Sequence, residues 1–516
     1  MTAKSSLPFA QKLFFAICLL MGVRSASAFA LLGPFAPWMT TQLSYQDGVS
    51  IGGPMNIGEG YRWNVPVITY GYDQSFLDFF GTNGVAAVES AIQILNNLPP
   101  ASQIILTNYP LDSLRVNYHA QAQNLIDLKS SALSSLVEHL GLAQPTRYVY
   151  CLHDFTFSNG VPIYTVLNRN FDPMTWAPST NVNGVVYDDG ITVNESWEVY
   201  GSNVFQRNTY LPLFPILFVD AQEIAVDPNE SSEVDDAVAD NASGSYYGSI
   251  FLNLTQDDAG GLAYLLSSNN TALESLIPGV QGTGTNTTNF VNTALRPGVE
   301  KITFQRTDYI SPSQHTFPVV TNQYVDSYYT NGVLQQQTLQ RVITQPDILF
   351  TANYIKLQNV SRTGTTNWIN NGTPGNDGPG VIQPSSVINF NQLGPSLYIG
   401  SPNYDTNAAG AVLPVWGSFD SSTNPPVAYP IVSNANCTRF HFILQGLPSN
   451  PFASIPQTDY AWNLTGQPNA LFSLQTSTNL QNWLTIGTIT NLGGTFTYVD
   501  WTWTNTPQRF FRTVPQ

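Results

Sequence analysis

Three histidines in the first third of the chain are the residues best suited to holding zinc: His119, His139 and His153. No two of them have the spacing that places two metal ligands on one helix face. A zinc site therefore requires the fold to bring the three side chains together. The simpler interpretation is three separate histidines, on the surface or hydrogen-bonded in the core.

Carboxylates are densest between residues 220 and 240, where no lysine or arginine accompanies them. Calcium takes about six to eight oxygen ligands, and a cation would relieve the mutual repulsion of these side chains. The segment does not match the EF-hand pattern, because Ser232 occupies the position that requires glycine. A calcium site and a solvated acidic loop are therefore both open. The candidate calcium ligands are Asp220, Asp227, Glu230, Glu233, Asp235 and Asp236.

Two tryptophans near the C-terminus, Trp501 and Trp503, are two positions apart and so share a face if they lie on a strand. Such a pair can stack on sugar rings, which makes polysaccharide one partner class to consider. Packing in a core is the simpler role for the same two residues.

The composition narrows the classes of function. The chain has 34 acidic and 18 basic residues and a formal charge of −16, so we do not expect it to bind nucleic acid. Only 10% of its residues are charged, well under the roughly 25% usual in soluble domains, and 42% are hydrophobic. This is not the profile of a charged disordered chain. Phosphate-binding and dinucleotide-binding glycine motifs are missing from the sequence, so no cofactor apart from calcium is predicted.

The first 28 residues have the features of a secretory signal peptide. Lys4 and Lys12 accompany an apolar run over 13–23, and Ala26-Ser27-Ala28 fits the small-x-small cleavage rule. The apolar run is too short to cross a bilayer as a helix and no comparable run follows, so no transmembrane span is expected in the mature chain. The sequence predicts secretion to the cell surface, periplasm or outer envelope after cleavage near Ala28. An N-terminal anchor that is retained is the alternative.

Cleavage at that point leaves two cysteines, Cys151 and Cys437. Export makes a disulfide chemically feasible, but the two residues fall in different predicted domains, so a disulfide and two buried thiols are both open. Two cysteines are too few for a zinc site without several histidines.

Alternation of β-branched runs with helical periodicity predicts an α/β or α+β N-terminal domain over residues 29–278. Gly141 suits a left-handed turn at the end of one predicted helix, and the Thr255 hydroxyl can cap the start of another. In chain order, the expected elements are a strand over 65–70, a helix from Thr82 or Asn83 to Leu98, a helix over 119–140, a strand over 147–152 and a helix from Thr255.

The rest of the chain is predicted to be β-rich, which makes the protein multidomain. Residues 279–432 are expected to form a β-rich middle region with long loops, and residues 433–516 a C-terminal β-sandwich. Asn331-Gly332 predicts a type I′ hairpin, because both residues accept positive φ angles. The hairpin strands are expected over 319–329 and 333–343, and the C-terminal strands over 439–444, 461–464, 471–476, 483–490, 495–499 and 509–514.

The C-terminal block contains Ser477-Thr478-Asn479-Leu480 followed by Trp483, and closes with Arg509-Phe510-Phe511-Arg512. These residues resemble the small immunoglobulin- or fibronectin-like modules at the C-termini of exported proteins of Verrucomicrobia-type bacteria. The resemblance implies a bacterial source and a module for packing, attachment or sorting.

Two short stretches of the N-terminal part are similar to matrixin-type zinc proteases: residues 61–70, which begin Tyr61-Arg62-Trp63, and residues 252–260. In that family two histidines of H-E-x-x-H-x-x-G-x-x-H hold zinc, and the glutamate activates water. The nearest segment here has Glu138 and His139, with Ser135 at the first ligand position. The resemblance implies a zincin-like scaffold that lacks the zinc motif of the family.

Two functional hypotheses follow. The first is an exported, non-catalytic binding or structural protein of the cell envelope or extracellular matrix, because low charge and several β-rich blocks are typical of adhesive surface proteins. The second is a secreted hydrolase on a zincin-like scaffold with a non-standard or lost zinc site. A fold that gathers His119, His139 and His153 beside a carboxylate would favour the second hypothesis.

Overall fold

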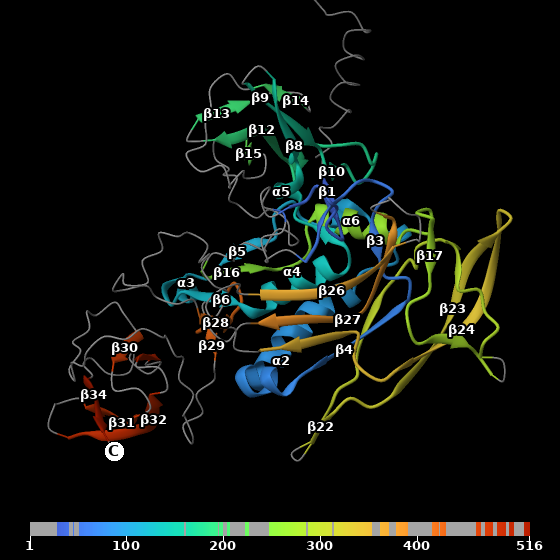
Figure 1. Cartoon of the computed structure of the whole chain (residues 1–516). Coiled ribbons are helices and arrows are strands. Elements are labelled where there is room, and N and C mark those ends of the chain that lie inside the picture. Colours follow the sequence, from blue (N-terminus) through green and yellow to red (C-terminus); the bar gives the residue numbers. More distant parts are fainter. Residues whose placement is uncertain are drawn as a thin grey trace, which may run out of the picture.

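The computed structural model describes residues 28–40, 45, 51–158, 161–193, 196–199, 204–206, 222–225, 247–284, 287–311, 314–352, 362–370, 378–390, 415–422, 424–429, 461–465, 470–477, 482–491, 495–499 and 510–515. Strands outnumber helices in these segments (Figure 1). The signal peptide predicted for residues 1–28 lies outside them apart from Ala28. Within the described segments, no helix combines the length and the apolar character needed to span a membrane.

A six-stranded, mostly parallel sheet forms the centre of the α/β part (Figure 1). Its strands are β3 (Tyr61–Arg62), β4 (Val67–Tyr72), β20 (Thr303–Arg306), β25 (Ile348–Thr351), β26 (Arg362–Asn370) and β27 (Gly380–Phe390). The order is β20-β4-β25-β27-β26, and β3 also pairs with β27. All pairs are parallel except β26 with β27. Parallel neighbours need crossover connections, so they come from distant parts of the chain.

This sheet combines the predicted N-terminal domain with the predicted middle region. β3 and β4 come from the former, and the other four strands come from the latter. The aromatic core is shared in the same way, because Phe76 and Phe80 pack against Phe350, Phe390 and Trp416. A boundary at residue 278 therefore does not separate two cores. Local periodicity missed this, since long-range parallel pairing leaves no local signal.

Helix α2 (Gln74–Asn96) follows β4 and packs on the central sheet. Asp73 caps it by accepting a hydrogen bond from the Phe76 N–H at 2.9 Å. The helix therefore begins before Thr82 or Asn83, where the sequence placed its start. A kink at Gly81, with φ 60° and ψ −158°, separates its first turns from the part that was predicted.

The helix expected over 119–140 is two helices separated by a strand: α3 (Tyr118–Ala122), β6 (Leu125–Asp127) and α4 (Leu128–His139). Asn124 has a φ of 52° and breaks the helical path. β6 pairs in parallel with β28 (Val415–Ser418), and this tertiary pairing overrides the helical periodicity of the segment. Gly141, with a φ of 106°, ends α4 in the left-handed turn that was predicted.

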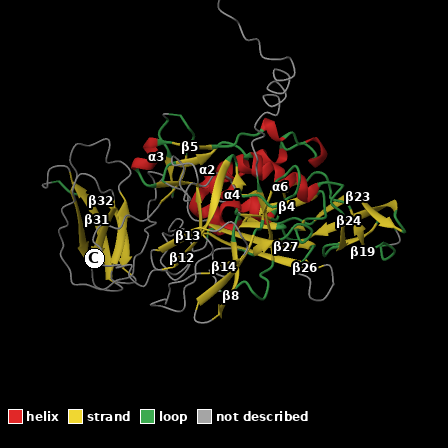
Figure 2. Ribbon diagram, turned by 90° about the horizontal axis from the view of Figure 1, so that it is seen from above, coloured by secondary structure: helices red, strands yellow, loops and turns green. Residues whose placement is uncertain are grey.

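Helix α6 (Gln256–Leu266) confirms the helix expected from Thr255. The side chains of Thr255 and Asp258 each accept a hydrogen bond from the other's backbone N–H, which is a capping box. Seen from above, α2, α4 and α6 gather on one side of β26 and β27 (Figure 2). Two short 3-10 helices, η2 (Ala101–Gln103) and η3 (Leu106–Asn108), contact α6.

Smaller sheets surround this core. The strand expected over 147–152 is present only at its end, because Pro145 starts a short helix, α5 (Pro145–Tyr148), before β8 (Cys151–Ser158). The strand pairs are β1 (Phe29–Gly33) with β2 (Gly53–Met55), β7 (Leu142–Ala143) and β10 (Asn170–Phe171); β5 (Leu114–Val116) with β16 (Ser249–Phe251); β9 (Val161–Leu167) with β8 and β14 (Val204–Gln206); β12 (Val185–Val193) with β11 (Asn181–Val182), β13 (Ser196–Val199) and β15 (Gln222–Ala225); β21 (Tyr309–Ser311) with β22 (Gln314–Thr316); and β28 with β29 (Val427–Ala428).

A five-stranded antiparallel sheet carries the predicted hairpin. Its strands, in spatial order, are β17 (Ala272–Ser275), β19 (Thr293–Arg296), β23 (Val320–Thr330), β24 (Val333–Ile343) and β18 (Val280–Gly282). Asn331 and Gly332 have φ angles of 51° and 77°, so the turn has the positive φ angles that the sequence predicted. The hairpin projects from the body of the protein (Figure 1).

The described strands after residue 433 form two small antiparallel sheets. β30 (Ala461–Thr465) pairs with β33 (Thr495–Val499), and β31 (Ala470–Ser477) lies between β32 (Leu484–Asn491) and β34 (Phe510–Pro515). Two such sheets fit the predicted β-sandwich. Five of the six predicted strands are present, and the one expected over 439–444 lies outside the described residues.

Candidate binding surface

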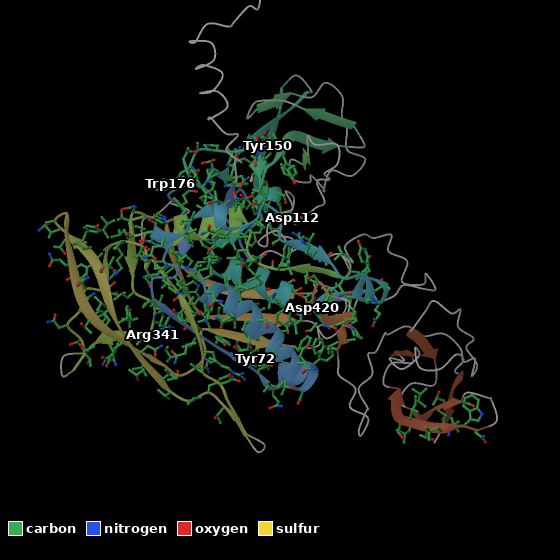
Figure 3. All side chains as sticks on the ribbon, turned by 180° about the vertical axis from the view of Figure 1, so that it is seen from behind. Tyr72, Asp112, Tyr150, Trp176, Arg341 and Asp420 are labelled. Carbon is green, nitrogen blue, oxygen red and sulfur yellow. The ribbon has the colours of Figure 1, made fainter. Side chains whose placement is uncertain are left out.

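The inner face of the five-stranded sheet, which is turned toward the protein core, contains every charged residue of its five strands. These are Glu274, Arg296, Asp326 and Arg341, with 1%, 1%, 4% and 4% of their surface exposed. Side chains of a strand alternate between the two faces of the sheet. Each of the four charged residues stands at an inward-facing position of its strand. Figure 3 shows Arg341 within the body of the protein, near the base of the hairpin.

Each inner-face charge has an oppositely charged partner. Arg296 holds Asp326 through two hydrogen bonds, at 2.9 Å from Nε and 3.1 Å from Nη2. Arg62 on β3 donates from Nε to Glu274 Oε1 at 2.7 Å. Arg341 pairs with Asp347, and its Nη1 lies 2.8 Å from Oδ2. These pairs are buried, so removing one partner would leave an uncompensated charge in the core.

The same guanidinium groups bind backbone carbonyls and join the sheet to its neighbours. Arg62 donates to the carbonyl oxygens of Leu265 and Asn270, near the end of α6, and to that of Arg296. Burial raises the pKa of the Glu274 carboxyl, and the positive charges of Arg62 and Arg296 oppose that rise. The inner face is thus a fixed attachment of the sheet to the core.

The outer face of the same sheet presents a row of apolar side chains to solvent. Strand pairing places Leu273 opposite Leu295, Leu295 opposite Tyr329, and Tyr329 opposite Leu334. Directly paired residues lie on the same face of a sheet. The row therefore crosses four neighbouring strands, and its three leucines are 41%, 41% and 49% exposed.

The remainder of the outer face is uncharged. Val325, 58% exposed, lies four residues along β23 from Tyr329 and hence on the same face. Ser275 and Thr293 are paired and join their hydroxyls at 2.8 Å. The other outer-face residues, all neutral, are Gln281, Thr321, Gln323, Ser327, Gln336, Thr338, Gln340 and Val342. A neutral, partly apolar face on a chain with a formal charge of −16 is a candidate docking surface.

The three predicted zinc ligands do not form a site. His119 is exposed on α3, whereas His139 is the buried last residue of α4 and its Nδ1 lies 2.6 Å from the Ser135 carbonyl oxygen. His153 lies on β8, with its ring 4.7 Å from that of Trp38. Across the described residues, no three His, Cys, Asp or Glu side chains come together in a group that could hold a metal.

The glycine that ends α4 allows a second test of the zinc motif. With Gly141 at the glycine of H-E-x-x-H-x-x-G-x-x-H, the three ligand positions fall on Ser134, Glu138 and Gln144, and the position of the glutamate falls on Ser135. Glu138 could ligate zinc, but the Ser134 hydroxyl and the Gln144 amide replace the imidazoles of the family set. The residues on and after α4 therefore do not fit a zinc centre of that family.

Several predicted sites fall outside the described residues. This holds for the two stacking candidates, Trp501 and Trp503, and for Cys437. Cys151 is buried, and its Sγ lies 3.7 Å from the Tyr148 carbonyl oxygen. All six calcium candidates also lie outside the described part: Asp220, Asp227, Glu230, Glu233, Asp235 and Asp236.

A cluster of ionisable groups lies at the edge of the central sheet. Glu89 of α2 accepts hydrogen bonds from the hydroxyls of Tyr70 at 2.6 Å and Tyr72 at 3.3 Å. Arg306 on β20 contacts Glu89 at 3.3 Å, holds Asp308 and lies over the Tyr72 ring. Burial and the neighbouring Glu89 raise the pKa of both tyrosines far from neutrality. Both tyrosines therefore stay protonated near neutral pH, and the contacts of the cluster hold β4, α2 and β20 together.

Residue patterns alone did not identify the outer-face row. The available signal was the alternation within 320–343, where the two charged residues share one phase and the exposed Val325 and Leu334 share the other. Scans against known protein families, curated proteins and solved structures find no match for this chain.

Proposed function

We propose that this chain is an exported, non-catalytic structural protein of the bacterial cell envelope or matrix, and that it associates with a second copy of itself through the outer face of the five-stranded sheet. The observation that carries the proposal is the exposed row Leu273, Leu295, Tyr329 and Leu334 on a face without charge. Apolar area that association removes from water supplies the driving force.

Charge favours this face as the contact between two copies. The chain has 34 acidic and 18 basic residues, so two copies repel each other over most orientations. A face without charge avoids that repulsion at close range and leaves no charge to be desolvated. Self-association through one shared patch needs an apolar centre with a neutral polar surround, which the Gln, Ser and Thr side chains provide.

The size of the sheet is compatible with such a contact. β23 and β24 have 11 residues each, so the hairpin is about 37 Å long at roughly 3.4 Å per residue. Five strands about 4.8 Å apart span roughly 20 Å. Because β17, β19 and β18 have only 4, 4 and 3 residues, the outer face covers roughly 500 Å² at these spacings. This is below, but of the same order as, the roughly 800 Å² that each partner buries in a standard interface.

The alternative function is a secreted hydrolase on a zincin-like scaffold. It is less well supported, because aligning Gly141 with the glycine of the family motif places Ser134, Glu138 and Gln144 at the ligand positions. These side chains do not form the imidazole set that holds the water-activating zinc in that family.

Sedimentation velocity of the full mature chain tests the proposal. We expect a dimer that dissociates on dilution, and a monomer for Leu295→Lys, which puts a charge in the middle of the row. Ile105→Lys is the matched control, because Ile105 is 58% exposed in the connection between η2 and η3, away from the sheet. A wild-type chain that stays monomeric at high micromolar concentration would overturn the proposed association.

Export is tested separately by sequencing the N-terminus of the protein recovered outside the cytoplasm. The proposal predicts Phe29 as the first residue, after cleavage at Ala28. Recovery of the protein only from the cytoplasm, with Met1 retained, would contradict it.

A further inference from the structure

A short loop beside α6 presents a tryptophan to solvent. It connects β10 to β11 and has the sequence Asp172-Pro173-Met174-Thr175-Trp176-Ala177-Pro178. Trp176 is 43% exposed and Met174 is 68% exposed. Figure 3 shows Trp176 at the rim of the α/β part, apart from Arg341 at the base of the hairpin.

The backbone of Trp176 has a φ of 59°, in the left-handed region. A bulky residue is disfavoured there, because its Cβ crowds the backbone carbonyl, and glycine or asparagine would fit with less strain. Strain of this kind persists only where the surrounding structure fixes it, and it concentrates at ligand-binding positions. The side chain at this position is therefore a candidate for a role beyond packing.

Hydrogen bonds within the loop hold that conformation. Asp172 Oδ1 accepts from the N–H groups of Met174 at 2.9 Å and Thr175 at 2.7 Å, and from the Thr175 hydroxyl at 2.9 Å. The Trp176 N–H donates to the Asp172 carbonyl at 2.7 Å, and the Asp172 N–H donates to the Ala177 carbonyl at 2.9 Å. The loop is thus closed on itself before any ligand arrives.

Two contacts fix the loop to α6. Pro173 lies so close to Gly260 that a Cβ on that glycine would be 2.5 Å from the Pro173 Cβ, so no larger residue fits there. The Trp176 ring lies 5.2 Å from the ring of Tyr264 at an angle of 77°. Tyr264 is itself 5% exposed, and its hydroxyl accepts a hydrogen bond from the Gly58 N–H at 3.0 Å. The indole is therefore positioned by a fixed aromatic ring and still half open to solvent.

We propose that the Trp176 loop is a binding site for a neutral sugar ring. The apolar C–H face of a pyranose matches a flat, pre-positioned indole and gains dispersion contacts across it. The formal charge of −16 disfavours acidic sugars. Asp172, the one charged residue of the loop, has its Oδ1 engaged by three donors. A single flat ring suits one face of a sugar better than a peptide helix or strand, which presents several side chains.

Calorimetric titration of the full mature chain with cellohexaose, maltohexaose, laminarihexaose and N-acetylchitohexaose tests this site. We expect at least one of the four to bind the wild-type chain, and Trp176→Gly to weaken that binding about tenfold or more. Glycine accepts the positive φ, so the loop keeps its shape and the unfolding midpoint stays close to that of the wild type. Trp176→Phe retains an aromatic ring and is expected to lose less affinity than Trp176→Gly.

Two further variants separate stacking from other effects. Val319→Ala changes an exposed apolar residue outside the loop, just before β23, and is expected to leave affinity unchanged. Asp172→Ala removes the acceptor that closes the loop but keeps the indole, so affinity falls by an intermediate amount, since the ring must be ordered on binding. Asp172 is in this sense a positioning residue.

The outcomes that overturn the sugar site are binding of none of the four oligosaccharides, or equal affinity in the wild type and Trp176→Gly. Co-sedimentation with phosphatidylcholine vesicles that Trp176→Gly abolishes, without sugar binding, would assign the loop to lipid and also overturn the proposal. The site is independent of the proposed dimer: Leu295→Lys is expected to keep sugar binding, and Trp176→Gly is expected to keep the dimer.

Discussion

The two faces of the five-stranded sheet are made by the same strands but differ completely in charge. On the inner face, Glu274, Arg296, Asp326 and Arg341 are buried and ion-paired. On the outer face the strands present only neutral side chains, among them the row from Leu273 to Leu334. The difference arises from the phase of alternation and not from composition, because neighbouring residues of one strand supply both faces.

In this sheet, charged side chains are buried and several leucines are exposed, which is the reverse of the usual preference. Charged side chains are rarely buried and leucines are rarely left exposed in a row. The inner charges are tolerated because each finds a partner and several carbonyls, which fixes the geometry of the sheet on the core. The outer leucines are left available for association. The inner face thus determines how the sheet is attached, and the outer face determines what it can contact.

Removing an inner-face charge should have the largest effect. Arg296→Met leaves the Asp326 carboxylate buried without its bidentate partner and leaves the carbonyls of Glu274 and Asn292 without their donor. We expect a loss of about 3–5 kcal/mol in the free energy of unfolding. Urea denaturation followed by circular dichroism measures it, with the outer-face variant Gln336→Met as control. A loss below about 1 kcal/mol would show that the inner pairs contribute little.

The buried carboxylate of Asp127 differs from those of the inner face, because Ser130 is its hydrogen-bond partner and no arginine pairs with it among the described residues. Asp127 caps α4 by accepting from the backbone N–H and the hydroxyl of Ser130. Burial raises its pKa from 3.8 to about 6. The folded state therefore binds more protons between these values, so this contribution to stability is complete below about pH 4 and is lost as the pH rises through about 6.

Replacing Asp127 by Asn removes that titration while keeping a capping side chain. We expect the stability of Asp127→Asn relative to wild type to increase by about 2 kcal/mol between pH 4 and pH 7. Urea unfolding of both proteins at the two pH values gives this difference, in which other titrating groups cancel. A difference that does not change with pH would contradict the raised pKa.

A charge placed on the outer face should affect association and leave folding intact. Leu334→Glu adds a carboxylate of the same sign as the net charge to the row. The dissociation constant of the dimer should rise at least tenfold, which is about 1.4 kcal/mol. Because the repulsion is electrostatic, 0.5 M salt should restore part of the affinity. Leu334→Gln, which removes the same apolar side chain without adding charge, is the control for lost packing.

The smallest effect is expected on the free energy of unfolding, when an outer-face residue is replaced by another neutral residue. Val325 is 58% exposed, so Val325→Thr removes little buried area. The free energy of unfolding should change by no more than about 0.5 kcal/mol, measured by urea denaturation of the monomer. A loss above about 1.5 kcal/mol would mean that Val325 packs inside the protein, and the assignment of the two faces would be wrong.

The sequence predicted elements whose cause is local. The Thr255 cap, the left-handed turn at Gly141 and the hairpin turn at Asn331-Gly332 were all found. Each depends on a hydrogen bond or a backbone angle within a few residues. The helix over 119–140 was mispredicted at its start, because pairing of β6 with β28 holds residues 125–127 as a strand. That partner lies almost 300 residues away in the chain, so periodicity could not show it.

The candidate sites depend on long-range contacts, and the sequence did not predict them. Zinc at His119, His139 and His153 needed convergence through the fold, and the fold keeps the three apart. The strained Trp176 could not be identified from its sequence, since its φ follows from the Asp172 hydrogen bonds and from the contacts of Pro173 and Trp176 with α6. Aromatic residues are common in this chain, at 12%, and only the backbone angle and exposure single out this one.

By itself the sequence determined that residues 320–343 form a hairpin and that its side chains alternate between two faces. It did not determine which face lies inward. Local preference places Asp326 and Arg341 in water, because burying an unpaired charge is unfavourable. Only the tertiary structure supplies their partners, Arg296 and Asp347, and places the Asp347 carboxylate within reach of Thr69 on β4 as well. These contacts turn the charges inward, and the alternation of the strand then necessarily exposes the neutral face.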